Sequence, residues 1–329
     1  MYLIVTIDTE EDNWGDYRPT GCTLENIKRL PSLQGLFDAY DVKPTYLVTS
    51  AVATNAMAVS ILKGILKEGK CEIGSHCHPW NTPPFEEKNT IRNSMLCNLP
   101  AELQYRKLES LHNMIMQNFG IQPISFRAGR WGYSQEVANN LCKLGYRIET
   151  SMTPFVDWKD DYGPDFSDIL PLPFKFFCEN VYPDTPDGAM LEVPVTIGFL
   201  QDNFSFCKRL LNLSRKNFAK KFHLMGCMYR LNLLNRVWLS PEFSNSGEMI
   251  KLTEIMAKKN YQVIHMTFHS PSLKAGLSPF VKSNDEEVQF LQRLKEFLAF
   301  THDSGMTSIT LADIVHSPHL LPNLMLPTA

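Results

Sequence analysis

The sequence has no excess of positive charge. Its 32 basic and 35 acidic residues give a net charge of -3, which makes no case for a nucleic-acid partner. No window approaches the roughly 20 apolar residues that a membrane-spanning helix needs. The N-terminal residues carry neither a basic region nor a long apolar run, so they do not resemble a signal peptide. We therefore expect a globular, cytoplasmic protein.

Cysteine is scattered along the chain and forms no C-x-x-C pair. The eight cysteines lie at positions 22, 71, 77, 97, 142, 178, 207 and 227. This pattern argues against a cysteine-rich zinc module. In a chain of 329 residues without an export signal, we expect reduced and mostly buried thiols.

Short β-rich runs alternate with helical patterns. Strands are expected at residues 2–7, 45–49, 71–75, 124–126, 146–150 and 262–268, and helices at 24–39, 56–67, 101–119, 135–144, 247–258 and 285–303, with a last β/α unit at 311–316. This alternation predicts an α/β fold of parallel β/α units, either a doubly wound sheet or a barrel. In both architectures, functional groups collect past the carboxyl ends of the strands.

Residues 154–241 interrupt this pattern. Pro, Gly and Asp punctuate residues 154–188, which indicates long loops, and a further strand is expected at 191–197. The chain has no internal repeat, low-complexity segment or evident linker. We therefore expect one domain over residues 1–329, with an irregular and basic insertion at about 154–241.

Four carboxylates follow the first expected strand: Asp8, Glu10, Glu11 and Asp12. Asp8 and Glu10 are two residues apart and could face one site, where one carboxylate binds a metal and the other takes a proton from water. An isolated acidic run is more often a solvated loop at a helix N-terminus. The catalytic interpretation therefore depends on the other clusters.

Two histidines, His76 and His78, follow the third expected strand. Residues two apart in an extended segment project to the same side, so both imidazoles could bind one cation while Cys77 points away. Imidazole is the commonest metal ligand near neutral pH. Two histidines, a carboxylate and an open position for water form a known catalytic zinc arrangement. The alternative is a surface turn with hydrogen-bonded histidines.

A fourth expected strand leads into Arg127, Arg130 and Trp131, with two glycines that allow close backbone approach. Arg127 could pair with a buried carboxylate such as Asp8 and keep it ionised. Trp131 offers a flat apolar face of the kind that packs against a sugar ring. Without the other clusters, a plain β/α turn with an exposed arginine would be the better interpretation.

The late strand carries two histidines near its end, His265 and His269. Along an extended chain they lie ~13 Å apart, so only one can occupy the strand tip. His269 is the better placed, and it could protonate a leaving amine or alkoxide.

Taken together and in order, these four motifs resemble those of the NodB-like polysaccharide deacetylases, carbohydrate esterase family 4. The resemblance spans about residues 1–150 and 245–315, and it favours a branch whose second motif reads H-x-H-P-W. It implies a distorted (β/α) barrel of about seven parallel strands. It also implies hydrolysis of N- or O-acetyl groups on sugars with a divalent metal, usually zinc.

The resemblance assigns a role to each motif residue. Asp8 would be the general base, Arg127 would orient it, and His269 would be the general acid. The metal ligands would be Glu10, His76 and His78. Substrate contacts would come from Trp80, Arg130 and Trp131.

This chain departs from the usual family pattern in three places. The adjacent Asp-Asp pair becomes Asp8-Thr9-Glu10, which leaves Glu11 and Asp12 as alternative ligands. The usual H-x-x-x-H spacing would place a ligand at position 80, which is Trp80, so His78 takes that role. The aspartate that tunes the acid histidine in many members has only a weak counterpart, Asp157.

A basic stretch falls outside the family motifs. No acidic residue lies between Asp202 and Glu242, whereas eight basic residues alternate there with apolar ones. We expect amphipathic helices in this segment. The favoured interpretation is that they cover the barrel and expose a solvated basic face. The alternative is that residues 204–238 contact the inner face of an anionic membrane. A lipid-linked glycan could be presented on such a membrane.

Two other functions remain open. One is a cytoplasmic amide hydrolase acting on a small non-sugar C–N substrate. The other is a glycan-binding homologue that has lost catalysis. The aromatic and proline-rich residues near the motifs favour an acetylated sugar or glycan, and the full set of catalytic residue types favours an enzyme.

Overall fold

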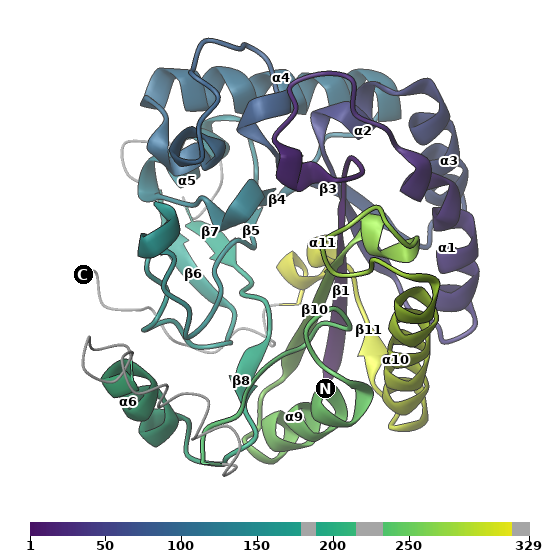
Figure 1. The fold of residues 1–329 in the computed structure, drawn as a ribbon, viewed down its shortest axis with the longest axis vertical. Coiled ribbons are helices and arrows are strands. Elements are labelled where there is room, and N and C mark those ends of the chain that lie inside the picture. Colours follow the sequence, from purple (N-terminus) through teal and green to yellow (C-terminus); the bar gives the residue numbers. More distant parts are fainter. Residues whose placement is uncertain (179–188, 215–232, 318–329) are drawn as a thin grey trace.

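A curled β-sheet surrounded by helices forms the centre of the molecule (Figure 1). The computed structural model describes residues 1–178, 189–214 and 233–317. In these residues nine strands form one sheet, in the order β10 (Val263–His269), β1 (Tyr2–Thr9), β2 (Pro44–Val48), β3 (Glu72–Cys77), β4 (Ser125–Ala128), β5 (Ile148–Glu149), β7 (Ala189–Glu192) and β6 (Phe174–Phe177), with β11 (Thr307–Ser308) beside β1. The seven strands from β10 to β7 run parallel, which confirms the predicted distorted barrel.

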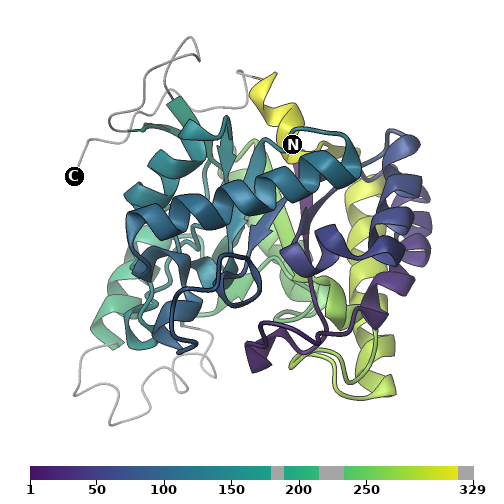
Figure 2. The ribbon, with the colours of Figure 1, turned by 90° about the horizontal axis from the view of Figure 1, so that it is seen from above.

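Helices lie around the outside of this sheet in both views (Figures 1 and 2). They are α1 (Leu30–Asp38), α2 (Ser50–Thr54), α3 (Ala56–Lys67), α4 (Ala101–Phe119), α5 (Gln135–Lys143), α6 (Phe204–Ser214), α9 (Ser246–Lys258), α10 (Asn284–Asp303) and α11 (Leu311–Val315). Side-chain caps define several starts, and Asn245, Ser283 and Thr310 form full capping boxes with the third residue of their helices. The long helix α4 ends at Gly120, which takes the left-handed conformation that favours glycine.

The two faces of β1 show how the sequence positions the site. Alternate residues from Leu3 to Ile7 lie in the large core between the sheet and the helices. Ile4 faces the other side, in a small apolar cluster that α11 completes. Thr6 and Asp8 continue this inner row, so the interior of the barrel changes from apolar to polar toward the carboxyl ends of the strands.

Proline explains two differences from the expected elements. Residues 24–39 do not form one helix, because Pro31 lacks an N–H and fits only in a first turn; a 3-10 turn at Glu25–Arg29 precedes α1 instead. The strand expected at 191–197 ends at Glu192, before Pro194. Ile197–Phe199 (β8) pairs with Arg236–Trp238 (β9) in a separate two-stranded sheet.

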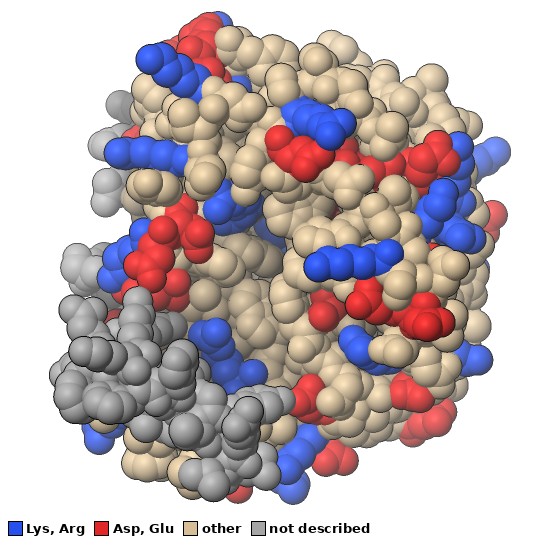
Figure 3. Space-filling view, in the orientation of Figure 1, with Lys and Arg blue, Asp and Glu red and all other residues tan. Residues whose placement is uncertain are grey.

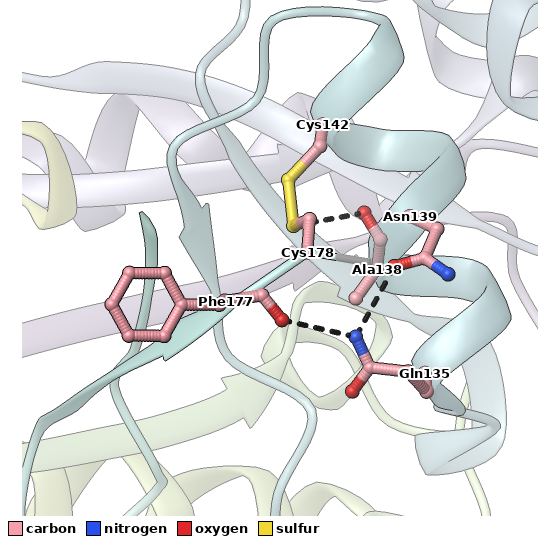
Figure 4. The surroundings of a disulfide bond; sticks show 6 residues. All are labelled: Gln135, Ala138, Asn139, Cys142, Phe177 and Cys178. Carbon is pink, nitrogen blue, oxygen red and sulfur yellow. Dashed lines mark hydrogen bonds between the residues drawn. A yellow bond between two sulfur atoms is a disulfide. The ribbon is translucent and has the colours of Figure 1, made fainter. Parts of the chain in front are cut away.

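One expectation about cysteine is wrong. Cys142 in α5 and Cys178, directly after β6, form a disulfide (Figure 4). The two are separated by 36 residues, so no local motif signals the pairing; the packing of α5 beside β6 creates it. Gln135 reinforces this contact by donating a hydrogen bond to the Phe177 carbonyl oxygen. Five other cysteines of the described residues are free, and Cys227 lies outside them.

Besides β6 and β7, which join the main sheet, the described parts of residues 154–241 contribute α6 and the β8–β9 pair at one side of the barrel (Figure 1). Residues 179–188 and 215–232, which include much of the expected basic segment, lie outside the described residues. The domain and insertion boundaries therefore stay predictions. Among the described helices, none combines the length and apolar character needed to cross a membrane.

Candidate active site

The carboxyl ends of neighbouring strands bring the predicted residues together. In the sheet register, Asp8 of β1 stands beside His269 of β10, and His76 of β3 stands beside Arg127 of β4. His78 follows β3 by one residue. These strand ends point toward the viewer in Figure 1. The space-filling view in the same orientation shows a hollow at the centre of this face (Figure 3).

Glu10, His76 and His78 form a buried group whose ligand atoms all lie within 4.8 Å of one another. The two Nε2 atoms are 3.0 Å apart, and Glu10 Oε2 lies 3.5 Å from Nε2 of His76 and 3.2 Å from Nε2 of His78. The other oxygen of Glu10 is buried without a hydrogen-bond partner. Two imidazole nitrogens and a carboxylate are zinc-type donors.

Hydrogen bonds behind the rings determine which nitrogens face inward. Nδ1 of His76 lies 3.1 Å from the Arg127 carbonyl oxygen, and Nδ1 of His78 lies 2.9 Å from Glu11 Oε1. Both partners are acceptors, so each Nδ1 carries a proton and each Nε2 points inward, where it can offer its lone pair to a cation. At 3.0 Å, the two Nε2 atoms need a proton or a metal cation between them to offset the repulsion of their lone pairs. The residues present therefore fit a divalent cation.

The surroundings of His78 favour positive charge. Burial opposes a charge on His78, but the carboxylates of Glu11 and Glu10 outweigh it and raise the pKa of His78 to about 9. Gly129 lets the chain after β4 pass close to this histidine, because a Cβ there would lie 2.5 Å from Cδ2 of the His78 ring. His78 therefore sits in a tight, negatively charged pocket.

The acidic run is buried, which excludes the solvated-loop interpretation. Glu11 accepts hydrogen bonds from Trp80 and Thr49 besides His78. Asp12 accepts from the backbone N–H groups of Glu25 and Asn26 and so caps the first turn after the loop. Both carboxylates support the structure around the donor group, whereas Glu10 Oε2 faces both histidines.

Asp8 is paired with Arg127, whose Nη1 lies 2.5 Å from Asp8 Oδ1. Arg127 is fully buried and also donates to the hydroxyls of Thr6 and Thr267. Burial would raise the pKa of Asp8, but Arg127 and the nearby histidines lower it to about 2. Asp8 is thus an oriented carboxylate, and its second oxygen lies 3.7 Å from Nε2 of His269.

His269 has a carboxylate partner that the sequence did not reveal. Its Nδ1 donates to Glu242 Oε2 at 2.9 Å, and its backbone N–H donates to the other oxygen of Glu242. Burial opposes charging of His269, yet Glu242 and the other carboxylates raise its pKa to about 10. Asp157 was the weak candidate for the aspartate that tunes this histidine. That prediction is wrong, because the Asp157 carboxylate lies beside Lys159 instead.

His265 lies deeper in the barrel. Its Nε2 is 2.9 Å from the Thr6 hydroxyl, and its Nδ1 is 3.3 Å from the Val193 carbonyl oxygen. Burial and the Arg127 guanidinium lower the pKa of His265 to about 3, so the ring is neutral. It belongs to the hydrogen-bond network beneath Asp8.

The donor group opens into a cavity of about 420 Å³ with aromatic walls. The aromatic residues that line it are Trp14, Tyr17, Trp131, Trp158, Trp238, Phe243 and Phe280. The His269 ring stacks between two of them, Trp14 and Phe280, at centroid distances of 5.5 and 5.4 Å. Apart from these rings, the wall includes Arg130, which donates to the Ser94 hydroxyl and lies over the Tyr17 ring.

The predicted substrate contact of Trp80 is wrong. Its side chain is buried, stacks on His78 at 4.1 Å and donates Nε1 to Glu11. Pro79 and the following 3-10 turn direct the indole into the protein and away from the cavity. Trp131 and Arg130 do line the cavity, and both have positive φ, which orients this turn toward it.

No family model matches this chain, and no curated protein matches it in sequence. Its structure is similar to that of a Mycobacterium smegmatis protein assigned as a polysaccharide deacetylase, with 16% identity over 100% of this chain and 94% of that chain and a TM-score of 0.53. It is also similar to the 4-α-glucanotransferase of Thermococcus litoralis (11% identity, 96% of this chain, 40% of that chain, TM-score 0.54). A third match is the Xyl-CE4 domain of a multidomain xylanase from the hindgut metagenome of Trinervitermes trinervoides (13% identity, 98% of this chain, 93% of that chain, TM-score 0.46).

A glucanotransferase shares this architecture, so the fold alone leaves the reaction open. The parallel seven-strand path and the likeness to the mycobacterial protein do establish the architecture. The chain has the fold of the NodB-like polysaccharide deacetylases of carbohydrate esterase family 4.

Proposed function

We propose that this protein is a metal-dependent hydrolase that removes acetyl groups from a sugar unit of a polysaccharide or lipid-linked glycan, with N-acetyl groups favoured over O-acetyl groups. One observation carries the proposal. The donor group of Glu10, His76 and His78 lies beside the ionised carboxylate of Asp8 and the imidazole of His269, on the floor of an aromatic cavity. The motif resemblance and the fold support the same reaction.

Glu10, His76 and His78 would hold the cation, and two imidazoles with one carboxylate favour Zn²⁺. When bound, such a cation lowers the pKa of a water molecule and polarises a carbonyl oxygen. The inward Nε2 atoms of the two histidines and Oε2 of Glu10 are the groups that would bind such a cation.

The chain's own residues would move the protons. Asp8 is ionised, and Arg127 holds its Oδ1, which leaves Oδ2 to take a proton from the attacking water. His269, held at Nδ1 by Glu242, presents Nε2 toward the same site. It donates its proton to the leaving nitrogen, so the products are acetate and a free amino sugar.

The cavity walls would bind the sugar. Trp131, Trp158 and Trp238 offer flat apolar faces, and such faces pack against the C–H surfaces of a pyranose ring. Arg130 at the rim would contact the sugar's polar groups.

Metal content and acetate release test this function together. The purified protein should contain about one divalent cation per chain and should release acetate from N-acetylated sugar oligomers. The double variant His76→Ala/His78→Ala should lose both the metal and the activity, because it retains only Glu10 of the donor group.

His112→Ala is the matched control, since His112 is a buried histidine of α4 outside the donor group. It should keep metal and turnover. Deacetylation by the metal-free double variant would disprove the assignment. Turnover of small non-sugar amides alone would instead favour the amide-hydrolase alternative.

The protein would act in the cytoplasm. The less favoured of the two interpretations of residues 204–238 adds a peripheral contact with the inner face of an anionic membrane. In the described part of this segment, α6 exposes Phe206 and Leu213, and Arg209 lies between them in the sequence. Each basic residue near an anionic surface contributes about 1 kcal/mol at low salt. If residues 204–238 make this contact, the protein should sediment with phosphatidylserine-containing vesicles at low salt and be released at high salt. Phosphatidylcholine vesicles are the control, and no binding at low salt would exclude the contact.

A further inference from the structure

A buried lysine lies at the centre of the loop that follows β3. Lys107 projects from α4, and its side chain is 0% exposed. Its ammonium donates to the carbonyl oxygens of Pro79, Thr82 and Pro84 at 2.9, 2.7 and 2.8 Å. The carboxylate of Glu87 lies 2.8 Å away. The loop thus surrounds the ammonium in the way that a metal-binding loop surrounds its metal ion.

Such burial is costly unless every partner is present. An ammonium loses its hydration on burial, and only several acceptors in good geometry compensate for that loss. Lys107 meets this condition with three carbonyl oxygens and one carboxylate, all drawn from residues 79–87. Its four acceptors come from one short loop, so the lysine constrains the conformation of that loop in particular.

The loop begins next to His78, whose imidazole the sheet does not hold in place. The pairing of β3 with β4 ends at Cys77, so His78 has no strand partner. The next residue, Pro79, gives its carbonyl oxygen to Lys107. Trp80 then stacks on the His78 ring and donates to Glu11. The position of His78 therefore depends on the loop that Lys107 organises.

We propose that Lys107 is a positioning residue for the metal centre, and that its ammonium fixes residues 79–87 so that Nε2 of His78 faces His76 and Glu10. The inference rests on the proposed function only for the presence of a metal at this donor group. His76 lies within β3 and is held by the sheet, so it should not depend on Lys107.

The test is the affinity of the apoprotein for Co²⁺ and Zn²⁺, together with the visible spectrum of the Co²⁺ form. Lys107→Met keeps the length and apolar stem of the side chain but removes the ammonium. It should weaken metal binding by about 10- to 100-fold, the range seen when a group supporting a ligand is lost. It should also change the Co²⁺ absorption, because one imidazole no longer sits in its coordination position.

Gln104→Met is the matched control. Gln104 is buried on the same helix and donates to a loop carbonyl, that of Leu99, away from the metal centre. It should leave metal affinity within about twofold. In the His78→Ala background, Lys107→Met should cause no further loss, because its effect acts through that histidine.

The results of these measurements distinguish the proposed function from the positioning role of Lys107. A wild-type protein that binds no divalent cation contradicts the proposed function. If the wild type binds metal and Lys107→Met binds it with unchanged affinity, the positioning role of Lys107 is overturned. The role is also overturned if Lys107→Met lowers the metal affinity equally in the wild-type and His78→Ala backgrounds. If Lys107→Met does not fold, Glu87→Gln replaces it, since it weakens the same cluster and keeps a polar partner. Unchanged metal affinity in Glu87→Gln would then overturn the inference.

Discussion

Replacing Arg127 with methionine should lower the free energy of unfolding by about 3–5 kcal/mol, the usual cost of removing one partner from a buried ion pair. Arg127 is fully buried and holds the Asp8 carboxylate, which is itself only 2% exposed. Without the guanidinium, that carboxylate and the hydroxyls of Thr6 and Thr267 lose a shared donor. Urea unfolding of the metal-free protein measures the effect.

The double variant Asp8→Asn/Arg127→Met provides the control for this prediction. Each single variant leaves one buried charge unpaired, whereas the double variant leaves none. The loss in the double variant should therefore be smaller than the sum of the two single losses by about 2 kcal/mol or more. Additive losses would show that the pair does not interact in the native state. All three variants should lack deacetylase activity.

The barrel and the site floor were predictable because they depend on local periodicity. Residues 2–7 form a short apolar run rich in β-branched residues, which identifies a strand, and strand ends in a parallel sheet share one edge. Asp8, His76, Arg127 and His269 each follow such a strand, so their meeting follows from topology alone. The H-x-H spacing likewise predicted imidazoles on one side, although His78 lies just beyond β3.

The sequence did not predict contacts made by residues in loops, because a loop has no periodicity that indicates where its side chains point. Glu242 is 27 positions from His269 in the sequence and lies outside the strands and helices. In the sequence it is only the acidic end of a basic segment. Trp80 was expected at the substrate because aromatic residues often line sugar sites, but the turn after Pro79 buries it behind His78. The Cys142–Cys178 contact likewise depends on packing between distant elements.

His269→Ala should lower kcat by about 10²- to 10⁴-fold, because a general acid contributes that much to the departure of a poor leaving group. Metal affinity should stay within about twofold of wild type, since His269 is not in the Glu10–His76–His78 group. Acetate release and metal titration on the same preparation measure both effects. His302→Ala, which removes a partly exposed histidine of α10, is the control and should change neither.

Glu242→Gln tests how His269 keeps its proton. The carboxylate of Glu242 is the main group that raises the pKa of His269 to about 10 against the effect of burial. A general acid works only below its pKa, so activity that depends on protonated His269 falls as pH rises through that value. Glutamine still accepts from Nδ1 through its amide oxygen but carries no charge, so the pKa of His269 should fall. The alkaline limb of kcat/KM should therefore move to lower pH in Glu242→Gln, while metal affinity is retained. A limb that stays in place would show that another group donates the proton to the leaving nitrogen.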